Sequence, residues 1–408
     1  MTVEAPPSPW RSSRFRWFAA GNSVNNIGEA IYDITLPLVV YDQTGSVWVM
    51  GVVAALIPAT LLLGPILGAI ADAHGSGRLV VIGLWVQLVA AVALVMLVTA
   101  EQLDVVAVIV LAAILQVAGS TYRVGWITGI PGMFPETPVR ARGTLSSLFV
   151  ATTIVGPLLF GALLPILDYS GLLWLDCVSF LAPLIVYAVG IRPLPARHPD
   201  ERVSVWRGVT LGTDVLRRRP VLLKLTLVLL PFDFVVAAAM PTLVIYHLRD
   251  TLGISATSVA WIFAIMNAAA LVGALGVSER KVFRPSVVVA WITVGLATAL
   301  VGASVPVVAV VVVSLVLLML LDGASSSAQS MMTVHYIPQE VYGRVSGLLR
   351  LVHGVPAVLG PVTVGALVPV FGTEAMFVIL AVVMACTVAT LVAMRHTLAA
   401  DIPEPESV

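Results

Sequence analysis

Residues 21–40 read GNSVNNIGEAIYDITLPLVV and lie within a long apolar segment that runs from about residue 15 to residue 41. A helix of this length can cross the ~30 Å hydrocarbon core of a bilayer, which needs roughly 20 apolar residues. Yet the segment contains two carboxylates, Glu29 and Asp33, and no lysine or arginine follows until Arg78. Charged side chains inside a span are costly and mark functional sites. The stretch therefore predicts a membrane protein and indicates where its chemistry lies.

The composition of the whole chain favours the same class. Of 408 residues, 59% are hydrophobic and 11% are charged, and the mean hydropathy is +1.03. Soluble domains are about 45–50% apolar and about 25% charged. A net charge of zero gives no sign of nucleic-acid binding. Cys177 and Cys386 both sit in apolar runs, so we expect core packing rather than a disulfide or a metal site, and no cofactor.

Apolar runs of membrane-spanning length recur along the chain, joined by short polar turns such as DQTGS and DYSG. Turns this short make consecutive helices antiparallel neighbours. We predict an all-α membrane protein with twelve transmembrane helices. The predicted spans cover residues 15–41, 47–71, 79–99, 105–125, 144–167, 172–191, 221–246, 256–278, 286–303, 305–332, 346–370 and 375–395.

Basic residues orient these spans, because short loops rich in Lys and Arg stay cytoplasmic. With the N-terminus inside, 21 of the 22 Lys and Arg residues fall at or near cytoplasmic loops, Arg123 among them, and Arg249 alone falls outside. Both termini are therefore predicted to be cytoplasmic. The scarcity of lysine beside arginine, alanine, valine and glycine points to a bacterial genome rich in G and C, and hence to a bacterial cytoplasmic membrane.

The chain repeats itself at an offset of 204 residues on either side of a polar stretch, residues 192–220. Parallel repeats of six spans signal a transporter whose site lies where two halves meet. We predict two pseudo-symmetric six-helix bundles, 1–191 and 221–395, a cytoplasmic linker, 192–220, and a cytoplasmic tail, 396–408. The matched positions include Glu29 with Asp233, Pro37 with Pro241, Arg140 with Arg344, Gly143 with Gly347, Gly156-Pro157 with Gly360-Pro361, and Gly161 with Gly365.

The loop GAIADAHGSGR, residues 68–78, resembles the loop between spans two and three of the major facilitator superfamily, with the pattern G-x-L-A-D-R-x-G-R-K. Gly68, Asp72 and Gly75 match this pattern. The arginine expected after the aspartate is an alanine, and Arg78 is the nearest basic residue left. The resemblance extends over the whole chain and implies alternating access, usually by a monomer. It implies a gating role for these four residues.

A second motif, IVGPLLFG at residues 154–161, is similar to the span-five motif of the drug-exporter branch of that superfamily, which includes macrolide and siderophore exporters. Small residues let helices approach closely, and prolines bend them. We expect a mechanical, gating role for Gly156, Pro157, Gly161, Gly360 and Pro361.

Asn22, Asn26, Glu29 and Asp33 are spaced 4, 3 and 4 residues apart, which places them on one face of a helix. We expect no Lys or Arg within the spans at their depth. The carboxylates should then face a water-filled cavity, exchange protons and bind substrate, with Asp233 as the symmetry mate of Glu29. The alternative is that they only fix helix packing. Further candidates for this proton-coupling and substrate-binding site are Asp322 and the aromatic residues Tyr32, Phe232, Phe234, Trp261 and Tyr336.

Two other titratable residues in the spans are weaker candidates. Asp176 lies near the outer end of span six, where a structural hydrogen bond is the simpler interpretation. His353 could titrate, but a histidine among small residues usually just bonds to a neighbour.

The chain has no Walker loop, zinc-ligand spacing or nucleophile–base pair, so we expect no enzyme, and an ion gradient as the energy source. The predicted function is proton-coupled efflux, by antiport, of a small amphipathic drug or natural product, and its partners are the substrate, protons and the bilayer. Antibiotic resistance is a plausible role. Three alternatives stay open: export of a siderophore or other metabolite, proton-coupled uptake, and a sensor or scaffold without transport.

Overall fold

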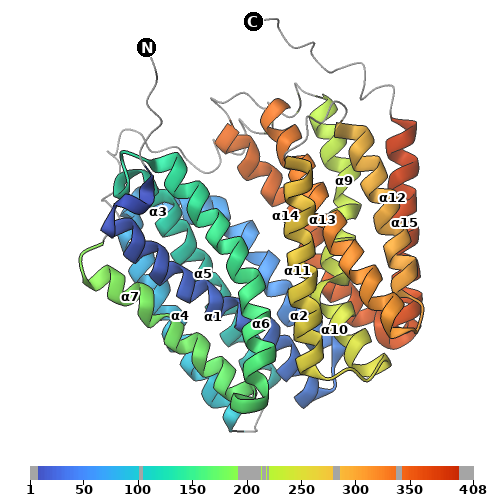
Figure 1. Ribbon diagram of the computed structural model, residues 1–408, viewed down its shortest axis with the longest axis horizontal. Coiled ribbons are helices and arrows are strands. Elements are labelled where there is room, and N and C mark those ends of the chain that lie inside the picture. Colours follow the sequence, from blue (N-terminus) through green and yellow to red (C-terminus); the bar gives the residue numbers. More distant parts are fainter. Residues whose placement is uncertain are drawn as a thin grey trace, which may run out of the picture. The chain divides into compact units, whose positions relative to one another are not determined.

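The computed structural model describes residues 8–100, 104–191, 213, 217, 220–278, 285–336 and 342–394, and these residues are helical nearly throughout (Figure 1). By their internal contacts they fall into two compact units, Met1–Val205 with Ser255–Ala264, and Trp206–Ile254 with Ile265–Val408. The tail at 396–408 and all of the linker at 192–220 except residues 213, 217 and 220 lie outside the described residues.

The N-terminal unit is built from long helices. They are α1 (Ser13–Thr44), α2 (Val47–Ala59), α3 (Gly64–His74), α4 (Ser76–Thr99), α5 (Val105–Met133), α6 (Pro138–Ser179) and α7 (Leu181–Ala188), preceded by the 3-10 turn η1 (Pro9–Arg11), and with the 3-10 turn η2 (Thr60–Leu63) between α2 and α3.

Helix α1 begins and ends with clear sequence signals. The Ser12 side chain caps the start of α1, and Gly45, with φ of 62°, ends it.

The second unit follows the same plan of long helices. It contains α9 (Pro220–Ala238), the π-helical turn η4 (Ala239–Leu243), α10 (Val244–Tyr246), the π-helical turn η5 (His247–Thr251), α11 (Ala256–Ser278), α12 (Pro285–Ala303), α13 (Val308–Tyr336), α14 (Tyr342–Phe371) and α15 (Thr373–Ala393). The first turns of α11 are grouped with the N-terminal unit.

Twelve helical passes can be counted in the described chain. Nine continuous helical stretches are long and apolar enough to span a membrane. One of them, Pro138–Ala188, makes two passes because the backbone of Asp168 is not helical (φ 54°, ψ −174°). The shorter apolar helix Val289–Ala303 and the charged helix α1 complete the set. The predicted all-α membrane fold is confirmed.

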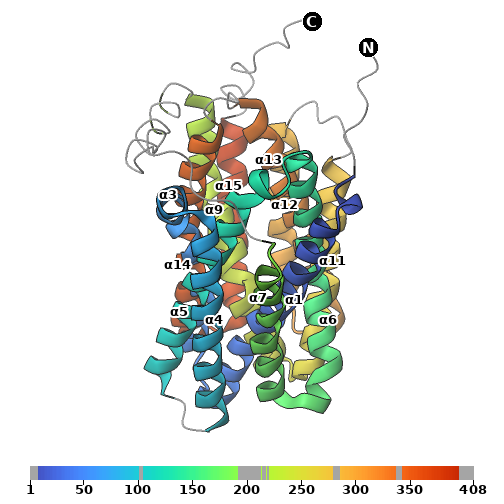
Figure 2. The ribbon, with the colours of Figure 1, turned by 90° about the vertical axis from the view of Figure 1, so that its left-hand side faces the viewer.

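Each unit pairs its first helix with the same later helix of the repeat. In the N-terminal unit α1 packs along α6, and α4 packs along α5 (Figure 2). In the second unit α9 packs along α14, and α12 along α13. Since α9 and α14 follow α1 and α6 at the predicted offset, the repeat seen in the sequence is a repeat of helix packing.

Separate hydrophobic clusters hold the helices of each unit. In the N-terminal unit one cluster gathers Phe15, Phe18, Trp126 and Phe134 in edge-to-face contacts near the start of α1 and the end of α5. Another lies around Leu36, Leu94 and Phe180. In the second unit Leu229, Val289, Val345 and Leu391 share a core. The polar face of α1 lies between the two N-terminal clusters in sequence.

Candidate functional site

Glu29 of α1 forms an ion pair with Arg123 of α5. The guanidinium Nη2 donates to Glu29 Oε2 at 2.7 Å. Asn25 Nδ2 and Gln87 Nε2 both donate to Glu29 Oε1, at 3.0 and 3.4 Å. The Glu29 side chain is 14% exposed and that of Arg123 43%. The prediction that no basic residue lies within the spans at the depth of these carboxylates is therefore wrong. The reason is that α5 continues to Met133, ten residues or about 15 Å beyond Arg123.

A second polar contact joins the same two helices further along. Gln116 of α5 donates through Nε2 to Asp33 Oδ1 at 3.4 Å. Asp33 lies four residues after Glu29 and Gln116 seven before Arg123, so each pair of side chains shares one helix face. The antiparallel order places Arg123 on Glu29 and Gln116 on Asp33. The predicted polar face of α1 thus has a matching polar face on α5.

Several buried polar atoms around this pair lack hydrogen-bond partners among the described residues. Tyr122 OH donates to Asn22 Oδ1 at 3.0 Å, but the other amide atom of Asn22 is unpaired. Unpaired buried polar groups are rare and cost about 1–3 kcal/mol each, so their concentration beside Glu29 distinguishes this place from ordinary helix packing. The atoms are Asn22 Nδ2, Asn25 Oδ1, Asn26 Nδ2, Tyr32 Oη, Gln87 Oε1 and Asp176 Oδ1.

Asp176 belongs to this cluster rather than to the membrane surface. Asp176 is 1% exposed, and it lies on α6, the helix that packs along α1. A Cβ added to Gly28 would lie 3.0 Å from Asp176 Oδ1. Among the described residues no basic side chain pairs with Asp176. The N-terminal unit thus buries Asp176 beside α1, whose Glu29 is the carboxylate that pairs with Arg123.

The second unit has a carboxylate–base pair at the matching position. Asp233 of α9 is hydrogen-bonded through Oδ2 to Nδ1 of His353 on α14. Their side chains are 21% and 25% exposed. The structure therefore brings together two titratable side chains, Asp233 and His353, that lie 120 residues apart in the sequence. Asp322 lies on α13, and its part in the site stays a prediction.

Glycines allow close contacts between helices beside these carboxylates. A Cβ added to Gly156 of α6 would lie 2.4 Å from the Cβ of Ala30, the residue after Glu29. A Cβ added to Gly360 of α14 would lie 2.8 Å from the carbonyl oxygen of Phe234, the residue after Asp233. The two contacts are related by the 204-residue offset. Only glycine allows this approach.

The aromatic candidates lie in different surroundings. Tyr32 and Phe232 are each 3% exposed and belong to the interior. Phe234 is half-buried, and Trp261 is 44% exposed. The side chain of Tyr336 lies outside the described residues. A substrate role for these residues stays a prediction.

Known proteins resemble this chain along its whole length. The family model of the Major Facilitator Superfamily matches it over residues 18–349 and again over 234–407. The chain belongs to this superfamily. It is a transporter of small molecules with several membrane passes, not an enzyme.

Individual relatives also match this chain over nearly its whole length. The chain is 25% identical over 373 residues to the multidrug efflux pump Tap of Mycolicibacterium fortuitum, which covers 88% of this chain and 90% of that protein. A bacterial homologue of the human lysosomal transporter Spinster, solved inward-facing and unoccupied, superimposes with a TM-score of 0.77 at 13% identity, over 98% of this chain and all of that one. A bacterial homologue of the iron transporter ferroportin gives 0.73 at 15% identity, over 95% and 98%. These structures show the fold.

The superfamily loop at 68–78 connects α3 to α4. Gly75, with φ of 91°, ends α3, a backbone conformation that side chains rarely allow. The backbone N–H of Arg78 donates to the Gly75 carbonyl at 3.2 Å. Gly68 meets no described atom within 4 Å of an added Cβ, and the side chain of Asp72 lies outside the described residues. Gating by this loop stays a prediction.

The prolines of the stretch 154–161 and of its repeat lie inside long helices. Pro157 is within α6 and Pro361 within α14. Gly161 also lies inside α6. Their mechanical role stays a prediction.

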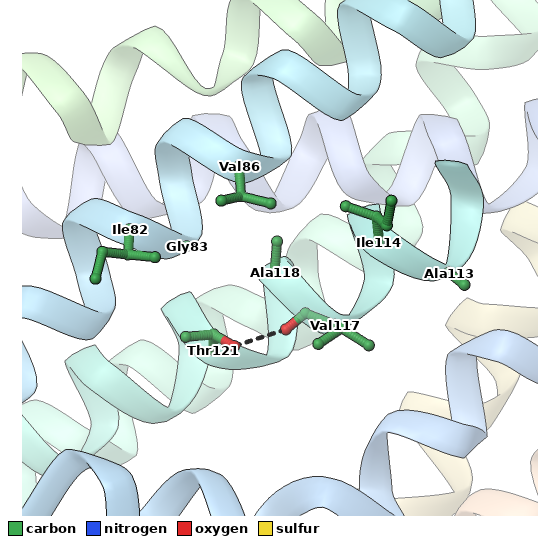
Figure 3. Close-up of a pocket in the computed structure, with 8 residues that line it drawn as sticks. All are labelled: Ile82, Gly83, Val86, Ala113, Ile114, Val117, Ala118 and Thr121. Atoms are coloured by element: carbon green, nitrogen blue, oxygen red, sulfur yellow. Dashed lines mark hydrogen bonds between the residues drawn. The ribbon is translucent and has the colours of Figure 1, made fainter. Parts of the chain in front are cut away.

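An apolar groove of about 340 Å³ lies between α4 and α5 (Figure 3). None of the predicted site residues lines it. Gln87 and Arg123 come from the same two helices but are not among its lining residues. The groove is therefore separate from the polar cluster. Its lining residues are Ile82, Gly83, Val86, Ala113, Ile114, Val117, Ala118 and Thr121.

Sequence reasoning missed five residues that bond to the α1 face: Asn25, Gln87, Gln116, Tyr122 and Arg123. One signal could have found two of them. Gln116 and Arg123 are seven residues apart, the spacing of one helix face. Gln87 stands alone among apolar residues in α4 and gives no periodic signal.

Proposed function

We propose that this transporter exports small amphipathic compounds, drugs or natural products, in exchange for protons. The observation that carries the proposal is the Glu29–Arg123 ion pair inside the polar cluster of the N-terminal unit. Similarity to a multidrug efflux pump supports the direction of transport. Polar and ionisable groups inside spans are expensive and serve ion or substrate pathways.

The chemistry follows from competition for the carboxylates. A proton that binds Glu29 removes the negative charge that holds Arg123, and the guanidinium is then free to interact with Asp33. A cationic substrate has the same effect, because it replaces the guanidinium at a carboxylate. Because the proton and the substrate bind to the same carboxylates, the binding of one releases the other. Their movements across the membrane are thereby coupled as an exchange.

Alternating access supplies the vectorial step in this proposal. The close glycine contacts at Gly156 and Gly360 keep the first helix of each unit fixed to its partner helix. Each unit can then move as one body and carry its carboxylate with it. We place the bundles at 1–191 and 221–395, the linker at 192–220 and the tail at 396–408. Both termini are cytoplasmic, and a monomer in a bacterial cytoplasmic membrane suffices.

Arg123 also supports a second candidate, the export of an anionic metabolite such as a siderophore. Its side chain is 43% exposed, and a guanidinium binds carboxylates through two parallel hydrogen bonds. In this case the anion would take the place of Glu29 on Arg123 when Glu29 holds a proton. The two candidates differ in the charge of the substrate and therefore in the compound that triggers proton movement.

The test is substrate-triggered proton movement in liposomes that contain the purified protein, read with a pH-sensitive dye. A cationic macrolide and an anionic siderophore are added in turn. Variants Glu29→Gln and Asp33→Asn are compared with Asp42→Asn, which removes a carboxylate from the outer end of the same helix. We expect the macrolide to move protons in wild type and in Asp42→Asn, but not in Glu29→Gln. If the siderophore alone moves protons, the anionic candidate is right. If Glu29→Gln couples normally, the proposed mechanism is wrong.

A further inference from the structure

The apolar groove between α4 and α5 is built from small side chains flanked by larger apolar ones (Figure 3). The small residues are Gly83, Ala113 and Ala118, and the larger ones are Ile82, Val86, Ile114 and Val117. The remaining lining residue, Thr121, is polar, and its hydroxyl donates to the carbonyl oxygen of Val117 at 2.8 Å. The lining therefore offers an apolar surface to whatever binds in the groove.

Two glycine contacts show how α4 and α5 lie against each other at this groove. A Cβ added to Gly83 of α4 would lie 2.7 Å from the backbone N of Tyr122 on α5. One added to Gly125 of α5 would lie 2.9 Å from the carbonyl oxygen of Ser76, the first residue of α4. The two helices are therefore antiparallel, and the end of the groove at Thr121 is the end nearest the start of α4.

The groove has the dimensions of a single acyl chain. Its larger residues are 39–58% exposed, and they lie on apolar helices of membrane-spanning length, so lipid chains are what they meet in a bilayer. From Thr121 to Ala113 the groove follows α5 for eight residues, or about 12 Å, and half of the hydrocarbon core is about 15 Å thick. Its volume of about 340 Å³ holds roughly eleven groups of the size of a water molecule, about 30 Å³ each.

Arg78 provides a positive charge at the end of the groove nearest the membrane surface. It is the third residue of α4 and lies four residues, or about 6 Å, before Ile82 on the same helix face. Arg78 is exposed, and it forms no ion pair with a side chain in the described part of the chain. A guanidinium binds phosphate through parallel hydrogen bonds. A lipid whose chain lies in the groove would therefore place its phosphate within reach of Arg78.

We propose that the groove binds one acyl chain of an anionic phospholipid and that Arg78 binds the phosphate of the same molecule. Apolar contacts alone select little, because the chain leaves one apolar environment for another. The headgroup therefore supplies the preference, and the groove supplies the position. Binding needs neither a transported substrate nor a proton, so the proposal goes beyond the proposed function and is tested independently of it.

The bound lipid would pack against the outer side of a helix pair whose inner side reaches the polar cluster. Gln87 follows Val86 on α4 and passes α5 at Gly119, where an added Cβ would lie 2.7 Å from Gln87 Nε2. The same amide donates to Glu29 at 3.4 Å. A lipid in the groove should therefore hold α4 against α5, and a ligand that binds only the folded protein raises its resistance to unfolding.

The experiment measures binding of the first phospholipid to the full-length purified protein in detergent by native mass spectrometry. Phosphatidylglycerol, which is anionic, is compared with phosphatidylcholine, which is zwitterionic, and both carry identical chains. One arginine near the membrane surface should favour the anionic lipid by about fivefold. Raising ammonium acetate from about 0.1 M to about 1 M should reduce this preference in wild type, because the Debye length falls from about 10 Å to about 3 Å.

Two pairs of variants separate the headgroup from the chain. Arg78→Gln should bind both lipids equally, whereas Arg142→Gln, which alters an exposed arginine near the start of α6, should keep the fivefold preference. Ala113→Phe fills the groove and should weaken binding of both lipids by fivefold or more. Ala107→Phe adds the same side chain to α5 outside the groove and should bind as wild type does. Phosphatidylglycerol should also raise resistance to unfolding more in wild type than in Arg78→Gln.

The proposal is overturned if wild type does not prefer the anionic lipid, or if Arg78→Gln keeps the preference. It is also overturned if Ala113→Phe binds the first lipid as tightly as wild type, because the lipid is then an ordinary neighbour in the bilayer. An excess of glycerophosphoglycerol, the headgroup without chains, should not displace the lipid; displacement would show a phosphate site in which the groove has no part. Since the salt effect is measured on wild type, a folding defect in one variant cannot imitate the expected result.

Discussion

Replacing Gly156 by alanine should force α6 away from α1 beside Glu29. The added Cβ would lie 2.4 Å from the Cβ of Ala30, about 1 Å closer than the 3.5–4.0 Å at which carbon atoms attract each other. Packed interiors yield little, and overpacking of this kind costs about 1–3 kcal/mol of stability.

Gly143 lies on the same helix and provides a matched control. No described atom lies within 4 Å of a Cβ added there, and alanine in place of an unhindered helical glycine gains about 0.5–1 kcal/mol. Both variants share that gain, so Gly156→Ala should be less stable than Gly143→Ala by the overpacking cost, about 1–3 kcal/mol.

The assay is unfolding of the purified protein in mixed micelles, followed by circular dichroism as denaturing detergent is added. The repeat provides an independent second pair, Gly360→Ala and Gly347→Ala, since a Cβ at Gly360 would lie 2.6 Å from the backbone N of Ala238, whereas one at Gly347 meets no described atom within 4 Å. Gly156→Ala should also transport more slowly than Gly143→Ala, because the α1 backbone next to Glu29 moves. Equal stability of Gly156→Ala and Gly143→Ala would refute the reasoning.

Three further predictions concern the polar cluster and the helix crossings. Glu29→Gln and Arg123→Gln should each destabilise the protein, and the double variant should lose less than their sum, with an interaction free energy of about 1–3 kcal/mol in a double-mutant cycle; strict additivity would mean that the pair contributes nothing. Gly323→Ala should prevent normal folding, seen as loss of a monodisperse peak in size-exclusion chromatography, because its Cβ would lie 1.9 Å from a backbone carbonyl oxygen; Gly276→Ala, which meets no described atom, should elute as wild type. Asp176→Asn should raise stability by about 1 kcal/mol in the unfolding assay, since it removes a buried group that no described base compensates; a loss of stability would show that Asp176 has a structural partner.

The positions of the helices could be predicted from the sequence with few errors. Bilayer thickness sets a minimum length for an apolar helix, and that length can be read without any tertiary contact. The sequence predicts a turn at DYSG between two spans, and there the structure has a non-helical residue, Asp168, inside the continuous stretch α6. The repeat at 204 residues was likewise visible, because equivalent helices need the same small residues at the same contacts.

Only one part of the candidate site, the polar face of α1, could be predicted from the sequence. The period of a helix shows that Asn22, Asn26, Glu29 and Asp33 share a face. It does not show what faces them. The error over Arg123 arose because span ends were judged from where apolar residues stop, and α5 in fact continues for ten residues beyond that arginine.

The sequence by itself determined the membrane class, the repeat and the acidic face of α1, because these depend on the solvent and on the geometry of a single helix. Tertiary structure alone decided that Glu29 meets Arg123, 94 residues away, and that Asp233 meets His353, 120 residues away. Which residues meet across two helices depends on how far each slides and turns against the other. That register is set by the sum of many packing contacts, such as those at Gly156 and Gly360, and no single segment of the chain contains it.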